Sequence, residues 1–398
     1  MLSKRLLRLK PSPTLALAAK AKELKAEGKD VISLSVGEPD WDTFDFIKDA
    51  AIQAIQEGQT KYTPSSGIPA LRQAIARQVN SDFNVDYSPN DVTVSIGGKF
   101  VIFSALQSLI DEGDEVIIPA PYWVSYPDMV ELCEGVPVCV ACEKETGYKL
   151  SPDKLRAAIT SKTKLLILNT PSNPTGFMYT QAELAALVSV LKEFPQVLVM
   201  SDDIYNRLVF NESGLAPHIL VSNPEMKDRL IIVNGLAKSY SMTGWRVGWA
   251  LGPSEVIGAM TRLQSQSVSC CSPFSQFAAI AAIEKGEEAV KKSVEILKDR
   301  CDFVCLELEK IPGVEIQRPD GAFYVWPNIS SFLGKSFNGK KLETSKDFAT
   351  ALLEDQMVAA VPGIEFGLDG YLRLSYALSK ERMGEALKRL QTFTSSLN

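Results

Sequence analysis

Short apolar runs alternate with segments of helical periodicity between about residues 92 and 252. Several of these runs are apolar on both faces, which is typical of buried strands in a parallel sheet. Their alternation with helices predicts an α/β region with a mostly parallel, doubly wound sheet. The predicted strands are residues 92–96, 115–119, 136–141, 164–169, 197–201, 230–234 and 247–252.

Helix-start signals support the helices between and before these strands. Ser151 is followed by Pro152, and Thr180 stands three residues before Glu183, in the order of a capping box. Nearer the N-terminus, the pattern predicts helices at 14–28 and 69–79 and a strand at 31–35.

The C-terminal part has a different order of elements, with a long helix at 287–310 and a last helix that begins at Ser379. Strands are predicted near 314–317, 323–326 and 371–376, and a loop at 334–345. This order indicates a smaller α+β domain, which the N-terminal segment completes. We expect an N-terminal arm and part of the small domain at 1–45, a large domain at 46–288 and a small C-terminal domain at 289–398.

The composition argues against several classes of protein. The 398 residues are 45% hydrophobic, enough for a large core, and the net charge of −6 provides no basic surface for nucleic acid or anionic membrane. No run reaches the roughly 18 apolar residues of a membrane span, and the N-terminus lacks the pattern of a secretory signal. We therefore expect a cytoplasmic protein.

The histidine and cysteine content limits the kinds of catalytic and metal sites that the chain could form. His218 is the single histidine, so Ser-His-Asp hydrolysis and histidine-rich metal sites are disfavoured. Seven cysteines, an odd number in a long chain without a signal, indicate reduced thiols. Cys139 and Cys142 could form half of a zinc site, but they lie in a predicted strand and no second pair has metal-ligand spacing. Core thiols are the better interpretation, and no metal is expected.

Polar loops follow four of the predicted strands, at the sheet edge where doubly wound folds bind ligands. After 92–96, Gly97-Gly98-Lys99 opens a helix whose N–H groups could hold a phosphate, although a glycine turn is the simpler explanation. After 164–169, the turn 171–176 presents Asn173, for which turn chemistry is the alternative.

The other two loops carry charged side chains. Asp202, Asp203 and Tyr205 follow 197–201, and Asp203 could instead cap a helix. After 230–234, Lys238 lies among small residues, eight positions before Arg246. This pair suits an amine that forms Schiff bases beside a guanidinium that binds an anion.

The segment 235–248 resembles, position for position, the lysine signature of class I aminotransferases in the fold type I pyridoxal-phosphate family. The resemblance covers nearly the whole chain and is closest to the bacterial I-beta subgroup of aspartate and prephenate aminotransferases. Further blocks match in order: Ser35-Val36-Gly37-Glu38-Pro39-Asp40, Lys61-Tyr62 with Gly67-Ile68-Pro69, Pro121-Tyr122-Trp123, Asn173-Pro174-Thr175-Gly176, Ser201-Asp202-Asp203-Ile204-Tyr205 and Arg373-Leu374-Ser375.

The resemblance implies pyridoxal 5′-phosphate as cofactor, held by Lys238 as a Schiff base. Asp202 would pair with its pyridine nitrogen, which keeps the ring an electron sink. The remaining contacts would be Trp123 on the ring, Asn173 and Tyr205 on the phenolic oxygen, and Arg246 with the N–H groups of Gly98 and Lys99 on the phosphate. Tyr62 would reach in from a second subunit, which implies a homodimer.

For the substrate, the resemblance implies that Arg373 binds the α-carboxylate through a two-pronged fork, and that Gly37 allows close approach to the backbone. Trp123 and Asn173 would also contact the substrate. Lys99 would bind a distal carboxylate, and Thr14 marks members that also accept prephenate. We therefore expect ping-pong amino-group transfer between aspartate or glutamate and a 2-oxo acid such as 2-oxoglutarate or oxaloacetate, with prephenate as a further acceptor.

Two positions depart from some relatives: Gly235 replaces a phosphate-binding serine, and Tyr126 replaces a histidine near Asp202. The alternatives on the same scaffold are an aminotransferase for aromatic or other amino acids and a pyridoxal-phosphate-dependent β-lyase. A non-enzymatic regulator would need a DNA-binding segment, for which we expect no room before the first block. A nicotinamide dehydrogenase would need a Gly-x-Gly-x-x-Gly turn after a strand, and none is present.

Overall fold

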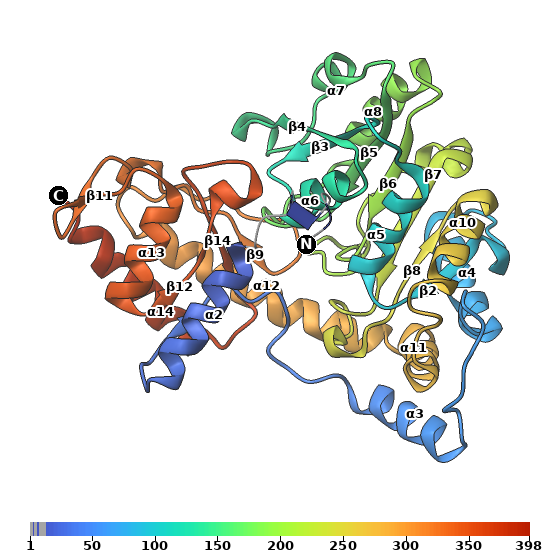
Figure 1. Ribbon diagram of the computed structural model, residues 1–398. Coiled ribbons are helices and arrows are strands. Elements are labelled where there is room, and N and C mark those ends of the chain that lie inside the picture. The colour runs from blue at the N-terminus through green and yellow to red at the C-terminus, as the bar shows by residue number, and fades with distance from the viewer. Residues whose placement is uncertain (1–2, 4–5, 8–12) are drawn as a thin grey trace.

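A central seven-stranded sheet organises the larger part of the molecule (Figure 1). The computed structural model describes residues 3, 6–7 and 13–398, with side chains at 3, 6–7 and 19–398. In spatial order the strands are β2 (Val92–Ser95), β8 (Gly248–Leu251), β7 (Leu230–Gly235), β6 (Leu198–Asp202), β5 (Thr163–Asn169), β3 (Glu115–Ala120) and β4 (Val136–Ala141). The predicted doubly wound, mostly parallel sheet is confirmed.

Strand β8 is the exception to the parallel order, because it runs antiparallel to both β7 and β2. The chain leaves β7 at the carboxyl edge of the sheet, loops through residues 236–247 and re-enters from that same edge. A strand that re-enters from the edge where its predecessor ended must run in the opposite direction. The loop that carries Lys238 and Arg246 is thereby held at this edge.

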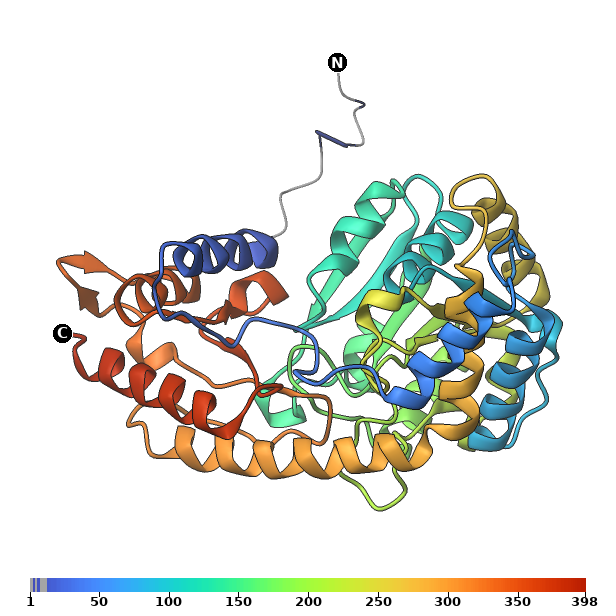
Figure 2. The ribbon, with the colours of Figure 1, turned by 90° about the horizontal axis from the view of Figure 1, so that it is seen from below.

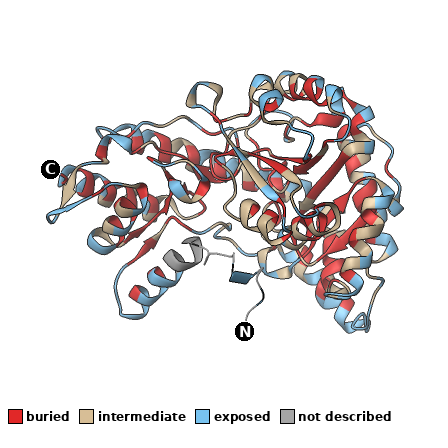
Figure 3. Ribbon diagram, turned by 45° about the horizontal axis from the view of Figure 1, so that its top comes forward, coloured by how far each residue is buried: buried red, intermediate tan, exposed pale blue. Residues whose placement is uncertain are grey.

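Both faces of the sheet are buried (Figure 3), and neighbouring residues of one strand point to opposite faces. Val199 and Met200 on β6 belong to different core clusters, as do Ile231 and Ile232 on β7. The helices around the sheet are α4 (Pro69–Phe83), α5 (Gly98–Leu109), α6 (Ser125–Leu132), α7 (Pro152–Ala158), α8 (Gln181–Glu193), α9 (Ile219–Ser222), α10 (Ser254–Ser265) and α11 (Pro273–Lys285). The apolar runs in the sequence therefore mark strands that are covered on both sides.

The helix-start signals are confirmed at two positions. Thr180 caps α8 and forms the reciprocal capping box with Glu183, and the Ser151 side chain accepts a hydrogen bond from Lys154 N at the start of α7. The helix predicted at 69–79 continues to Phe83, and the following residue, Asn84, ends it in the left-handed conformation.

Smaller sheets form the second body of the molecule (Figure 1). Strand β14 (Leu372–Ser375) lies between β13 (Val361–Pro362) and β9 (Tyr324–Val325), and β1 (Ile32–Ser33) pairs with β12 (Val358–Ala359). The parallel β1–β12 pair joins the N-terminal segment to the C-terminal part, as predicted. The helices are α2 (Pro13–Ala26), α12 (Glu287–Glu309), α13 (Ser345–Gln356) and α14 (Lys380–Ser395), while α3 (Asp45–Gln56) lies against the larger body.

Helix α12 passes from one body to the other without a break (Figure 2). The predicted boundary between residues 288 and 289 falls in its first turn, so the proposed domain limits remain a prediction. Other predictions were wrong in detail. Residues 314–317 form only one isolated bridge, Glu315 with Asn328, and 334–345 is not a plain loop but contains the hairpin of β10 (Ser336–Phe337) and β11 (Lys340–Lys341).

The cysteines differ in how far they are buried. All seven cysteines are free. Cys142 is buried as predicted, but Cys139 is exposed because β4 is the edge strand of the sheet, so the core interpretation was wrong for that residue. Within the described ranges, no group of three metal-ligating side chains is present, and no helix combines the length and apolar character of a membrane span.

Candidate active site

A cavity of about 420 Å³ opens at the carboxyl edge of the central sheet, against the second body. Ten of the twelve residues that the sequence singled out line it: Gly37, Gly98, Lys99, Trp123, Asn173, Asp202, Tyr205, Lys238, Arg246 and Arg373. They come from the N-terminal segment, the start of α5, the end of β6, the loops that follow the central strands, and β14. Their convergence is the main feature of this site.

Tyr62 and Thr14 do not line this cavity. Tyr62 is 90% exposed, on the loop between α3 and α4. Thr14 lies in helix α2, and its side chain falls outside the described residues.

Asp202 is the last residue of β6 and is buried beside the cavity. Tyr126 donates a hydrogen bond of 2.5 Å to its Oδ2, and the Ile204 N–H donates one of 3.3 Å to its Oδ1. Burial raises the pKa of Asp202 to about 6, although the hydrogen bond from Tyr126 acts in the opposite direction. The carboxylate is therefore poorly stabilised until a cation lies beside it.

Lys238 follows β7, and its ammonium group donates a hydrogen bond to the carbonyl oxygen of Gly37. Burial and the nearby Arg373 guanidinium lower the pKa of Lys238 to about 8. An amine with such a pKa is uncharged in an appreciable fraction of molecules near neutral pH. Lys238 and Asp202 line the same cavity, as a role for both in one reaction requires.

Arg246 lies beside the N-terminus of α5, where Gly97 precedes the first turn with a φ of +90°. A Cβ at Gly97 would lie 2.7 Å from Arg246 Nη2, so only glycine leaves room for the guanidinium there. The first N–H groups of a helix have no intrahelical partners and attract anions. Together with the exposed guanidinium of Arg246, the α5 N-terminus forms a site suited to a phosphate.

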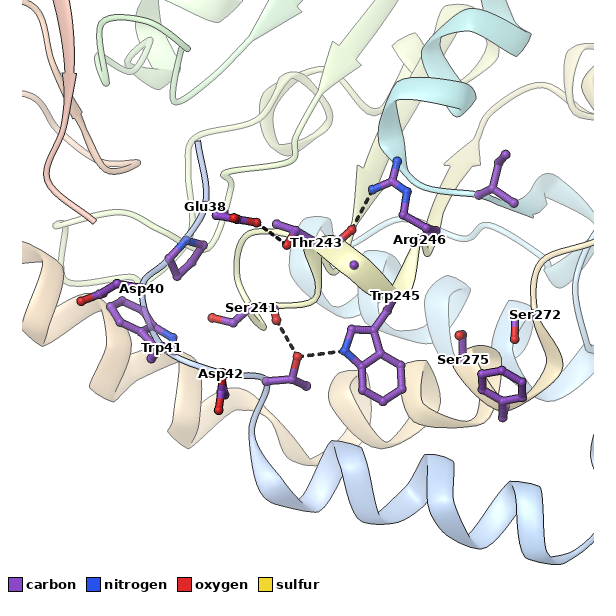
Figure 4. Close-up of a pocket in the computed structure, with 15 residues that line it drawn as sticks. Glu38, Asp40, Trp41, Asp42, Ser241, Thr243, Trp245, Arg246, Ser272 and Ser275 are labelled. Carbon is purple, nitrogen blue, oxygen red and sulfur yellow. Dashed lines mark hydrogen bonds between the residues drawn. The ribbon is translucent and has the colours of Figure 1, made fainter. Parts of the chain in front are cut away.

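A second cavity of about 720 Å³ adjoins Arg246 on its outer side (Figure 4). There, Arg246 Nη1 donates a hydrogen bond of 2.8 Å to the Thr243 carbonyl oxygen, and the Thr243 hydroxyl donates one of 2.7 Å to Glu38. The Trp245 indole N–H donates one of 2.9 Å to Thr43. These bonds hold the loop that carries Arg246 while one side of the guanidinium faces open space.

Arg373, on β14, is buried with much of its hydrogen-bonding capacity unused. Its Nη1 donates a hydrogen bond of 3.1 Å to Asn173 Oδ1, and its Nη2 donates one of 2.7 Å to the Ser35 carbonyl oxygen. Its guanidinium carbon lies 4.6 Å from the centre of the Tyr324 ring. Nε has no partner within the described part of the chain. A carboxylate is the natural ligand for such a cation.

Lys99 and Trp123 contact each other in the lining of the cavity. Lys99 Nζ lies 4.9 Å from the centre of the Trp123 indole, a cation–π contact that leaves the ammonium open to the cavity. The Trp123 ring meets the Tyr126 ring edge-on, with 5.3 Å between ring centres. Tyr126 thus supports both Asp202 and Trp123.

Tyr126 and Tyr324 hold functional side chains in place, and the sequence analysis gave neither residue a role. Tyr126 was noted only as a departure from some relatives. Tyr324 lies in the predicted strand 323–326, where an aromatic residue is an ordinary core residue. Its place in the site follows from the pairing of Tyr324 with Ser375, which brings it next to Arg373, and one sequence does not reveal that pairing.

Comparison with known proteins agrees with this geometry. The model of the family described as "Aminotransferase class I and II" matches residues 29–390. An aspartate/prephenate aminotransferase of Cereibacter sphaeroides is 49% identical over 100% of this chain and 99% of its own length. An aspartate aminotransferase of Geobacillus stearothermophilus is 45% identical over 98% of each chain.

Solved structures show the same architecture. The aspartate aminotransferase from Rhizobium meliloti superposes with a TM-score of 0.96 at 41% identity, covering 100% of both chains. The aspartate aminotransferase from Thermus thermophilus with maleate gives a TM-score of 0.90 at 39% identity, covering 98% of this chain and 99% of that chain. The resemblance noted in the sequence is confirmed, and this chain belongs to the class I and II aminotransferases.

Proposed function

We propose that this protein moves amino groups between L-aspartate or L-glutamate and 2-oxo acids, with pyridoxal 5′-phosphate bound to Lys238. The observation that carries the proposal is the shared cavity, in which the Lys238 amine, the Asp202 carboxylate and the Arg373 guanidinium come together. A covalent amine, a partner for a pyridine nitrogen and a carboxylate fork are the groups that transamination of amino acids requires.

The residues present fit pyridoxal phosphate. Arg246 and the α5 N-terminus, kept open by Gly97, would hold the phosphate through Gly98 N–H and Lys99 N–H. Asp202 would pair with the protonated pyridine nitrogen. This positive partner would offset the free-energy cost of burying the Asp202 carboxylate. Trp123 would stack on the ring, and Tyr205 and Asn173 would donate hydrogen bonds to the phenolic oxygen. When bound, the cofactor supplies an electron-withdrawing ring that stabilises negative charge at the substrate Cα.

Lys238 would act first as a nucleophile and then as a base. Its pKa of about 8 leaves it uncharged in about a tenth of the molecules at pH 7. An uncharged amine can attack a carbonyl carbon, whereas an ammonium cannot. The uncharged Lys238 amine would also act as the general base that takes the proton from the substrate Cα, and the resulting ammonium group would act as the general acid that gives the proton back.

Two cations would select the substrate. Arg373 would bind the α-carboxylate through its fork, and the absence of a side chain at Gly37 would let the amino acid approach the backbone. Lys99, which lines the same cavity, would pair with a second carboxylate. The relatives named above as aspartate aminotransferases, one of them solved with the dicarboxylate maleate, support this choice of substrate class.

Prephenate is proposed as a further acceptor, with Thr14 as the position that marks such members of the family. The name of the Cereibacter sphaeroides relative supports this extension. We also propose a cytoplasmic homodimer in which Tyr62 of each subunit completes the neighbouring site. The proposed division of each subunit remains an arm with part of the small domain at 1–45, a cofactor domain at 46–288 and a small domain at 289–398.

The assignment of Lys238 can be tested by trapping. Borohydride reduction of the protein with pyridoxal phosphate should fix one cofactor per chain on the Lys238 peptide, as read by mass spectrometry. Lys99 is the internal control, because it lines the same cavity and should carry no label. Lys238→Ala should lose the visible absorbance and at least about a thousandfold in kcat/KM. Retained turnover and absorbance in this variant, or label on Lys99, would exclude the assignment.

The substrate class can be tested with Lys99→Ala. Loss of one charged hydrogen bond should lower kcat/KM for aspartate and glutamate about 10- to 100-fold. Aromatic amino acids have no second carboxylate, so their kcat/KM should change less than about threefold. Lys346→Ala, at an exposed position of α13, is the control for charge removal. Equal losses for both substrate classes would remove Lys99 from substrate recognition, and release of ammonia with pyruvate would indicate a lyase.

A further inference from the structure

Two buried tyrosines that line the cavity meet through their hydroxyl groups. Tyr205 Oη and Tyr324 Oη lie 3.0 Å apart, and their rings meet edge-on at 81°. Both side chains are at least 97% buried, so water is not the ordinary partner of either hydroxyl. Because each hydroxyl has one hydrogen, the hydroxyl that accepts in this contact keeps its own hydrogen for another partner.

Tyr324 contacts three parts of the site that are distant in sequence. It lies on β9, opposite Ser375 of β14, and the Arg373 guanidinium stacks on its ring at 4.6 Å. Its hydroxyl also approaches Gly37 so closely that a Cβ at that position would lie 2.9 Å away. Tyr205, by contrast, belongs to the loop after β6. One side chain therefore joins the carboxylate-binding strand, the N-terminal segment and the sheet loop.

We propose that Tyr324 is a positioning residue, whose hydroxyl donates a hydrogen bond to Tyr205 Oη so that the Tyr205 hydrogen points to the cofactor. The inference rests on the proposed function, in which Tyr205 donates to the phenolic oxygen of pyridoxal phosphate. Tyr205 has a single hydrogen, so if it donates to the cofactor, it must accept from Tyr324. The Tyr205 oxygen has lone pairs for this second role.

The arrangement has a measurable consequence at the nitrogen that joins Lys238 to the cofactor. A hydrogen bond donated to Tyr205 polarises its O–H group and strengthens its own donation by roughly 10–30%. Stronger donation withdraws charge from the phenolic oxygen, the neighbour that stabilises the protonated form of that nitrogen. Tyr324 should therefore lower the midpoint pH at which the visible absorbance of the bound cofactor changes.

The test is Tyr324→Phe, which removes the hydroxyl but keeps the ring under Arg373. The midpoint pH of the absorbance change should rise by about 0.2–0.6 pH unit. The charged groups that bear on Lys238 are Arg373, Glu38, Arg246 and Asp202, and this variant alters none of them. Tyr376→Phe is the matched control. Tyr376 directly follows β14, which pairs with the strand of Tyr324, and its buried hydroxyl donates to the Ala322 carbonyl oxygen. Its midpoint should not move.

A double-mutant cycle decides whether Tyr324 acts through Tyr205. In a Tyr205→Phe background, further removal of the Tyr324 hydroxyl should leave the midpoint unchanged, because the hydroxyl it serves is gone. A shift of the same size in both backgrounds, or no shift in Tyr324→Phe with the cofactor still bound, would overturn the inference and leave the proposed function standing. Absence of any Lys238-linked absorbance in the unmodified protein would instead overturn the proposed function.

Discussion

Burial shifts the pKa values of the two ionisable groups that define the site in opposite directions. It raises the pKa of Asp202 to about 6 and, with Arg373, lowers the pKa of Lys238 to about 8. In the folded protein without a ligand, the charged form of each residue is therefore less stable than it is in water. A cofactor that supplied a cation to Asp202 and an aldehyde to Lys238 would offset both costs, so binding of pyridoxal phosphate should raise the unfolding free energy.

The cost at Asp202 can be measured with Asp202→Asn in cofactor-free protein. The folded pKa of about 6 lies above the reference value of 3.8, so the destabilisation is complete above about pH 6 and fades as the pH falls towards 3.8. Relative to the unmodified protein, the variant should gain up to about 3 kcal/mol in unfolding free energy at pH 8 and roughly half of that at pH 5.

Urea unfolding at the two pH values gives this difference, in which titrations common to both proteins cancel. Asparagine has one acceptor oxygen in place of two, so the variant loses one of the hydrogen bonds from Tyr126 and Ile204 N–H. This loss adds an offset that does not depend on pH, so the change between pH 5 and pH 8 is the quantity to compare. A stability difference that is the same at both pH values would show that Asp202 has an ordinary pKa.

Individual residues could be predicted from the sequence where they belong to a contiguous motif. Lys238 and Arg246 lie in one segment, and Asp202 and Tyr205 in another, so the matching blocks identified them directly. Tyr324 could not be found in this way, because its partner Tyr205 is 119 positions away and the contact depends on the packing of two bodies.

At the scale of elements, Asp202 ends β6 and Asp203 is the first residue after it, and the two side chains have different partners. Asp202 faces the cavity, while Asp203 accepts a 2.6 Å hydrogen bond from Ser201 and lies 3.3 Å from His218 Nε2. The His218 ring stacks on Phe83, the last residue of α4, at 3.9 Å, and its Nδ1 accepts a hydrogen bond from Leu220 N–H in α9. His218 therefore ties the end of β6 to two helices.

This contact predicts strong coupling between His218 and Asp203. The two atoms are close enough for an ion pair but not aligned as a hydrogen bond. His218→Phe should leave the buried Oδ2 of Asp203 without a polar neighbour, although Ser201 still donates to Oδ1, and should lower the unfolding free energy by about 3 kcal/mol. Asp203→Asn/His218→Phe should be less destabilised than the sum of the single variants by at least about 1 kcal/mol in urea unfolding. Additive losses would mean that the pair contributes no interaction energy.

Helices and strands could be predicted where the hydrophobic pattern of the sequence matches the burial of the element. The strands of the central sheet are covered by helices on both faces, so their apolar runs mark them clearly. The failures fall where strands are short or pairing is non-local. Residues 314–317 form a single bridge, and the hairpin of β10 and β11 is built mostly from polar residues, a composition typical of a loop. The antiparallel direction of β8 depends on where its loop returns, which a hydrophobic pattern does not encode.

At the scale of the whole molecule, the site is assembled from both bodies but is open on one side. Ser35 and Arg373 come from the second body and the lysine loop from the first, with α12 continuous between them. The cavity next to Arg246 faces outward, and an aromatic side chain that is 90% exposed, Tyr62, has no place in the cavity of its own chain. Both features suit a second copy that covers the opening.

The proposed dimer predicts complementation between two defective subunits. In a hybrid of Lys238→Ala and Tyr62→Ala chains, one site would combine an intact Lys238 with an intact Tyr62 from the partner, while the other would carry both defects. Random pairing in an equal mixture should restore about a quarter of the unmodified sites. Lys238→Ala mixed with Arg373→Ala is the control, because both residues line the cavity of the same chain and no hybrid site would be intact.

Activity and bound cofactor after unfolding and refolding of the mixtures together measure this recovery, with separately refolded variants as the baseline. Recovery in the first mixture but not in the control requires Tyr62 to act across the interface. If Tyr62 acted within its own chain, every hybrid site would contain a defect, and the two mixtures would behave alike. A monomeric protein would give the same result, so sedimentation of the refolded samples separates a wrong residue from a wrong oligomeric state.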